Sequence, residues 1–140
     1  MKSLAIVFLF LAFLLTDTFA QLAIIANKSV PINEIDNSQL LDFYTGDKSF
    51  WSNGESVIIF DLQQKSQLRD EFFKFLGKSP VRIKSIWMKR MLSGDADPPE
   101  FLDSEDEMLE KIASTSGAIG YIHKSKVSTT VKELKIISKD

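Results

Sequence analysis

The sequence contains no cysteine, and His123 is the only histidine among its 140 residues. The missing cysteines exclude disulfide bonds, cysteine metal sites, thiol nucleophiles and a lipid anchor on an N-terminal cysteine. The H-E-x-x-H, G-x-S-x-G and P-loop motifs are absent as well. We therefore predict a protein that is not an enzyme and that holds no cofactor and no metal.

The chain also lacks a large excess of charge of either sign, since its formal net charge is −2. Nothing in this balance attracts a nucleic acid, so no nucleic-acid partner is expected. Hydrophobic residues make up 44% and charged residues 26%, which is the composition of a folded globular chain.

A single long apolar run occurs, from Leu4 to Leu15, and Lys2 precedes it. The run is too short to span a bilayer comfortably, because a spanning helix needs roughly 20 apolar residues. Thr18-Phe19-Ala20 follows it with the small residues of a cleavage site. We predict a cleaved signal peptide over residues 1–20 and one α/β domain over 21–140, located in the periplasm or secreted. The alternative is an uncleaved N-terminal anchor.

Short apolar runs predict strands at residues 22–26, 57–60 and 118–122, and residues 131–137 are a fourth strand or the return segment. Polar N-cap residues and closing glycines predict the helices between them. The N-caps are Asp36, Ser66, Ser79 and Ser104, and the closing glycines are Gly46, Gly77 and Gly94. The resulting order, β-α-β-α-α-α-β-β, predicts a mixed, mostly parallel sheet flanked by helices.

The helix that begins at Ser79-Pro80 carries Ile83, Trp87 and Met91 at intervals of four residues. This spacing predicts that all three side chains lie on one buried stripe. Residues 95–103 contain Pro98-Pro99 and are predicted to form a loop.

Several motifs, taken in order, resemble the small phosphate-type solute-binding-like proteins of bacteria. The resemblance covers about residues 22–122, and its pieces share the family's order and spacing. They are Leu40–Gly46, Asp47–Trp51, Asn53-Gly54, Val57–Asp61, Ser66–Phe72, Trp87, Gly94, Pro98-Pro99 and Gly117–Ile122.

This resemblance implies one lobe of a type 2 periplasmic-binding-protein fold. Full solute-binding proteins of the family resemble two lobes around a cleft, and the lobe with the Ser/Thr-Gly phosphate loop has no counterpart here. The implied function is weak binding of phosphate or another oxyanion, linked to ABC-type phosphate transport. A membrane transporter is the implied partner, and a homodimer could supply the missing wall.

The candidate anion site is the turn that enters the helix after residue 66. A helix N-terminus offers free N–H groups and partial positive charge to an anion. Lys65 and Arg69 add cationic side chains, and the site residues are Gln64, Lys65, Ser66, Gln67 and Arg69. The alternative is that Ser66 only caps its helix.

Two neighbouring stretches carry opposite charge. Residues 65–90 hold eight basic side chains, and residues 95–110 hold eight acidic ones without a base. Such stretches are either solvated faces or contacts with a charged partner. The acidic stretch lacks the spacing of a calcium loop. Because the charged stretches could contact a partner, the second functional hypothesis is a lobe without a ligand that binds an envelope protein.

Overall fold

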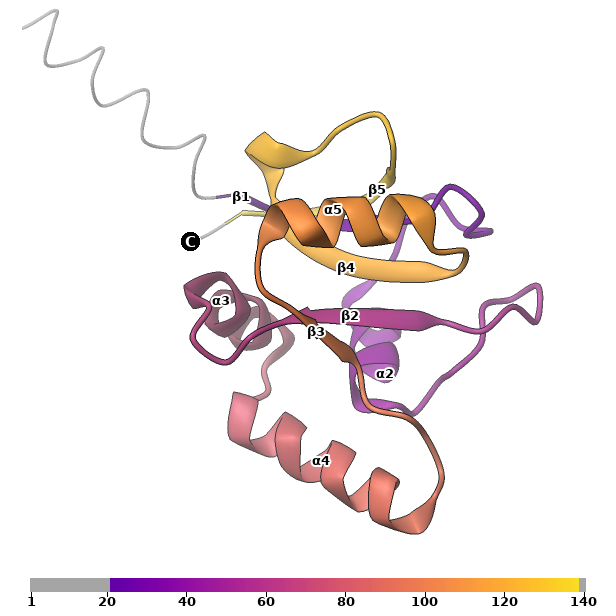
Figure 1. The fold of residues 1–140 in the computed structure, drawn as a ribbon, viewed down its shortest axis with the longest axis vertical. Helices are drawn as coiled ribbons and strands as arrows, with labels where there is room; N and C mark the ends of the chain where they lie inside the picture. The colour runs from indigo at the N-terminus through magenta and orange to yellow at the C-terminus, as the bar shows by residue number, and fades with distance from the viewer. Residues whose placement is uncertain (1–20, 139–140) are drawn as a thin grey trace, which may run out of the picture.

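The computed structural model describes residues 21–138, so the predicted signal peptide lies outside the described residues. Five strands form one sheet in the order β3-β2-β4-β1-β5 (Figure 1). They are β1 (Gln21–Ala26), β2 (Ile58–Leu62), β3 (Glu100–Leu102), β4 (Ala118–His123) and β5 (Lys132–Ser138). Strand β1 runs antiparallel to β4 and β5, and β2 runs parallel to β3 and β4. Four strands therefore share one direction, which confirms the mixed, mostly parallel sheet.

Four α-helices connect the strands, and their ends confirm the predicted caps. They are α2 (Asn37–Thr45), α3 (Gln67–Leu76), α4 (Pro80–Ser93) and α5 (Glu105–Ser114), followed by the short 3-10 helix η2 (Lys124–Lys126). Asp36, Ser66, Ser79 and Ser104 each accept a first-turn N–H, and Gly46, Gly77 and Gly94 adopt left-handed conformations after α2, α3 and α4.

The helices cover both faces of the sheet, as two consecutive residues of β4 show. A Cβ atom on Gly120 would lie 2.5 Å from Met108 Sδ and 2.6 Å from Ile112 Cδ1, so α5 packs tightly on that face. Tyr121 points to the opposite face, because side chains alternate along a strand. Its ring stacks on Phe72 of α3 at 4.0 Å. Helices α2 and α3 therefore lie on the face opposite α5.

Helix α4 lies outside these layers and packs against α2. Ile83 and Trp87 are its buried residues, and the Trp87 indole N–H donates to the Tyr44 carbonyl oxygen at 2.8 Å. The burial predicted for these two side chains is confirmed. The burial predicted for Met91 is wrong, since 51% of that residue is exposed. Met91 lies beside a hollow that no other side chain fills.

The predicted loop over residues 95–103 was also partly wrong, because it contains β3. This strand pairs in parallel with the end of β2, from Phe60 with Glu100 to Leu62 with Leu102. Strand β2 in turn extends through Asp61 and Leu62, beyond the predicted strand end at residue 60. The two additions build the sheet edge beside the candidate site. Within residues 21–138, no helix combines the length and apolar character needed to cross a membrane.

Candidate functional site

Asp61 is the centre of a buried polar network at the carboxyl end of β2, where 1% of the residue is exposed. Its Oδ1 accepts from the Tyr121 hydroxyl at 2.5 Å and from the Leu62 amide at 2.8 Å. Its Oδ2 accepts from Arg69 Nε at 3.1 Å. Neighbouring strands thus bring Asp61 and Tyr121 together, and the first turn of α3 supplies the cation.

Burial is the main influence on the titration of this network. It raises the pKa of Asp61, although the Tyr121 hydrogen bond and the Arg69 charge act in the opposite direction. Burial and the nearby Asp61 charge also raise the pKa of Tyr121 and of Tyr44 well above the usual tyrosine value. Both phenols therefore keep their protons at physiological pH, and Tyr121 stays a hydrogen-bond donor to Asp61.

Arg69 is buried, with 4% of its side chain exposed, rather than projecting into solvent as a free surface charge. Its guanidinium carbon lies 4.8 Å from the ring centre of Phe73 and 5.8 Å from that of Phe101. Only Nε bonds to Asp61, and the terminal nitrogens donate to no other group among residues 21–138. Because those residues contain no buried side-chain nitrogen without a partner, the terminal nitrogens must reach the surface.

The other predicted site residues form the turn before α3. Ser66 Oγ accepts from the Arg69 amide at 3.2 Å, so Ser66 does cap the helix. The Ser66 amide closes the turn on the Gln63 carbonyl oxygen at 2.9 Å. Gln64, Lys65 and Gln67 are exposed. The structure thus brings Ser66 and Arg69 together and leaves the other three side chains around the helix N-terminus, open to an incoming anion.

A hollow of about 370 Å³ adjoins this turn, between α4 and the segment that leads into β3. Sequence reasoning missed it, because its walls come from four separate segments. Its lining residues are Asp61, Gln63, Gln64, Arg69, Ile83, Lys84, Trp87, Met88, Met91, Pro98, Pro99 and Phe101. The only sequence signal for it was the pair of prolines, which stiffens one wall. The network of Asp61 and Arg69 lies at the polar end of the hollow.

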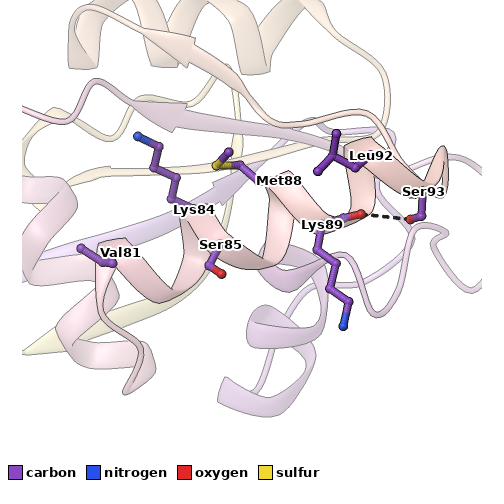
Figure 2. A pocket seen from close by; sticks show the side chains of 7 residues that line it. All are labelled: Val81, Lys84, Ser85, Met88, Lys89, Leu92 and Ser93. Atoms are coloured by element: carbon purple, nitrogen blue, oxygen red, sulfur yellow. Dashed lines mark hydrogen bonds between the residues drawn. The ribbon is translucent and has the colours of Figure 1, made fainter.

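The outer face of α4 is a second apolar surface, and it shares Lys84 and Met88 with the hollow (Figure 2). Val81, Met88 and Leu92 are 79%, 52% and 87% exposed, and Lys84 and Lys89 lie on the same face. In Figure 2 the Ser93 hydroxyl donates to the Lys89 carbonyl oxygen at the end of the helix. Helix α4 is thus apolar both towards the protein and towards solvent.

His123, the only histidine, forms a pair away from this network. His123 Nδ1 lies 2.8 Å from Glu105 Oε1, in a pair at the end of β4. Among the described residues, no group of three or more histidine, aspartate or glutamate side chains could hold a metal ion. The acidic stretch before and within α5 serves the helix start instead, since the Glu107 carboxylate accepts from the Asp103 amide and Ser104 accepts from the Glu107 amide.

Comparison with solved structures identifies the same fold in phosphate transport proteins. An ABC-type phosphate transport receptor from Vibrio cholerae matches with a TM-score of 0.66 at 20% identity. A putative phosphate ABC transporter substrate-binding protein from Clostridium perfringens, solved with bound phosphate, matches with a TM-score of 0.69 at 21% identity. PstS from Borrelia burgdorferi matches with a TM-score of 0.61 at 17% identity. No family model matches the chain, and no curated protein matches it either.

Each of these matches covers 84% of this chain but only 48%, 46% and 48%, respectively, of the matched protein. The chain therefore spans about half the length of the solved structures that it matches. This confirms the predicted resemblance to one lobe of a phosphate-type solute-binding protein. The matched proteins are described as transport receptors and binding proteins, not as enzymes.

Proposed function

We propose that this chain is an exported solute-binding-like protein that binds phosphate or another oxyanion weakly at the N-terminus of α3. The observation that supports this proposal most strongly is Arg69, a buried arginine whose terminal nitrogens have no partner within residues 21–138. A guanidinium with free N–H groups suits an oxyanion, because it donates two parallel charge-assisted hydrogen bonds. The helix N-terminus beside it adds backbone donors and partial positive charge.

The binding should be weak, because the fold supplies one wall of a cleft. An ion held from one side remains partly hydrated, and salt screens its attraction to exposed charges. We expect a dissociation constant between roughly 10 μM and a few millimolar, which is about −4 to −7 kcal/mol. A second copy of the chain could close the site and tighten it. A membrane transporter of the ABC type is the partner that this function would require.

An NMR titration with inorganic phosphate tests the proposal. The amides of residues 64–69 should shift, because they surround the helix N-terminus. Lys65→Gln should weaken binding about two- to fivefold by removing an exposed cation near the anion. Lys74→Gln is the matched control, since Lys74 is an exposed lysine in the last turn of the same helix. A phosphate concentration of about 50 mM exceeds every dissociation constant expected here. If the amide signals do not shift at that concentration, the oxyanion function is wrong.

The outer face of α4 supports a second function, docking to an acidic protein of the cell envelope. Helix α4 contains no acidic residue, and Arg82, Lys84 and Lys89 are exposed on it, so an acidic partner would complement it. A photo-crosslinking residue placed at Leu92 should then give one discrete adduct in cells. Reversing the charges of Lys84 and Lys89 to glutamate should abolish that adduct. An adduct that survives charge reversal contradicts this function.

A further inference from the structure

The hollow beside Arg69 combines a cationic end with apolar walls. Arg69 lines it, and the terminal nitrogens of this buried arginine have no partner in the described part of the chain. The guanidinium lies against the rings of Phe73 and Phe101, and its Nε bonds to Asp61, so the surrounding protein positions it before any ligand arrives. The donors are thus preorganised, which lowers the entropy lost when a ligand binds.

The charge of the hollow favours an anion. Its lining contains two cations, Arg69 and Lys84, and one carboxylate, Asp61. Both oxygens of Asp61 are already engaged, one by Tyr121 and the Leu62 amide and the other by Arg69 Nε. The unused groups are therefore cationic donors. The fork of a guanidinium matches the two oxygens of a carboxylate.

The rest of the lining is apolar and incompletely covered. Ile83, Trp87, Met88, Met91, Pro98 and Phe101 form these walls. Met88, Met91 and Phe101 remain 52%, 51% and 45% exposed, so a ligand could remove their apolar surface from water. A hydrated inorganic ion gains nothing from such walls. The volume of about 370 Å³ lies in the range of pockets for small organic molecules, about 300–1,000 Å³.

We infer that this hollow binds an organic carboxylate with an apolar body, with the carboxylate on Arg69 and the body between α4 and the Pro98–Phe101 segment. The inference rests on the proposed oxyanion function, since both place the anion at Arg69, and it specifies the class of ligand. Each methylene buried against the walls strengthens binding about fourfold. A ligand with an apolar body should therefore bind far better than its bare headgroup.

Four probes separate the contributions of charge and of the apolar body: octanoate, acetate, octanamide and inorganic phosphate. The readout is the methyl NMR signal of methionine in the full chain. Met88 and Met91 line the hollow, whereas Met108 is buried between α5 and the sheet and serves as an internal control. Octanoate should shift the first two signals and leave the third unchanged. It should bind at least about tenfold more tightly than acetate or octanamide.

Two variants on adjacent positions of α4 provide the matched control. Met91→Ser removes an apolar wall and should weaken octanoate binding about three- to tenfold. Leu92→Ser changes an 87% exposed residue on the outer face and should leave binding unchanged. Both positions are exposed, so both variants should fold. Arg69→Lys keeps the charge but loses the fork, and it should weaken octanoate at least about tenfold.

Several outcomes would overturn the inference. If octanoate and acetate bind equally, the apolar walls contribute nothing. If octanamide equals octanoate, the anion does not lie on Arg69. An octanoate concentration of about 10 mM exceeds the dissociation constant of a specific site of this kind. If no methionine signal shifts at that concentration, the hollow is not a ligand site. Phosphate-induced shifts of amides 64–69 without an octanoate effect would leave the oxyanion function intact and reject only the organic ligand.

Discussion

The Asp61 carboxylate receives its donors from β2, β4 and α3, so its setting depends on all three elements at once. The Tyr121 hydroxyl also lies 3.3 Å from the Leu62 amide, which places the phenol at the junction of β2 and β4. A buried ion pair of this kind contributes little net stability, because desolvation offsets the attraction between the charges. Its more important effect is to fix the Arg69 side chain, which leaves the terminal nitrogens at the hollow.

The raised pKa of Asp61 leads to a prediction about pH. The folded protein holds the Asp61 proton more tightly than the unfolded chain, whose aspartates titrate near pH 4. The stability linked to this group is therefore fully present below about pH 4 and is lost as the pH rises through the folded-state pKa. Tyr121→Phe removes a hydrogen bond that lowers this pKa, so the total loss of stability should become larger and should extend to higher pH. At neutral pH the variant should be about 1.5–3 kcal/mol less stable than wild type.

Urea denaturation of wild type and variant between pH 4 and 8 measures this effect. Tyr44→Phe is the matched control, because the Tyr44 hydroxyl donates to the Phe60 carbonyl oxygen at 2.8 Å and not to Asp61. Its stability cost should not change with pH. The explanation fails if the cost of Tyr121→Phe is the same at pH 4 and at pH 8.

Helix α4 is attached mainly through its contacts with the end of α2. Besides the Trp87 bond, Arg90 Nε donates to the Thr45 carbonyl oxygen at 2.7 Å, and Arg90 pairs with Asp47 at 2.5 Å. Gly46 makes this approach possible, since a Cβ there would lie 2.9 Å from Arg90 Cδ and 3.1 Å from the Trp87 ring. The glycine that ends α2 therefore also creates the seat for α4, and so one wall of the hollow.

Trp87→Ala should destabilise the protein by about 3–5 kcal/mol, the range for removing a large buried aromatic side chain. It deletes a 7% exposed side chain and the hydrogen bond to Tyr44. Met91→Ala, one turn later on the same helix, should change stability by less than about 1 kcal/mol, because Met91 is half exposed. Denaturant melts of the three proteins measure both changes. Equal effects of the two substitutions would contradict the packing described for α4.

The helices could be predicted from the sequence because their signals are local. Ser66 and Gly77, for example, mark the two ends of α3 within a dozen residues. Strand β3 escaped prediction because it has three residues and exists only through its pairing with β2, which lies 40 positions earlier at Phe60 and Glu100. The burial of Met91 was predicted wrongly for a related reason. Helical spacing shows which residues share one face of α4, but it does not show how far the protein surface beneath that face extends.

The candidate site was predictable only in part. The turn and its cap at Ser66 follow from a local motif, and both are present. The burial of Arg69 could not be predicted, because its partner Asp61 is itself buried by Tyr121, 60 positions away. The hollow requires α4 and the segment before β3 to face one another across the end of β2. Contacts between such distant segments depend on tertiary packing, and the hydrophobic periodicity of a single sequence does not reveal them.

The sheet ends in two edge strands that resist pairing with other chains. Strand β3 is short, and in the opposite edge strand β5 Lys135 lies next to the exposed Ile136. Short edges and lysines discourage edge-to-edge association. A homodimer that closes the anion site would therefore form through the helices or the site itself, rather than through an extended sheet.

The segment before β1 leads to a prediction about export. Lys2, the apolar run Leu4–Leu15 and the small residues of Thr18-Phe19-Ala20 have the order of a secretory signal. Cleavage after Ala20 would keep the β1 residues Gln21–Ala26, which pair with both β4 and β5. Intact mass measurement of the exported protein should therefore give a chain that starts at Gln21. Ala20→Lys should block processing, because the peptidase site needs a small residue there, whereas Lys28→Ala beyond the site should not. A full-length wild-type chain retained in the membrane fraction would show that the segment is an uncleaved anchor.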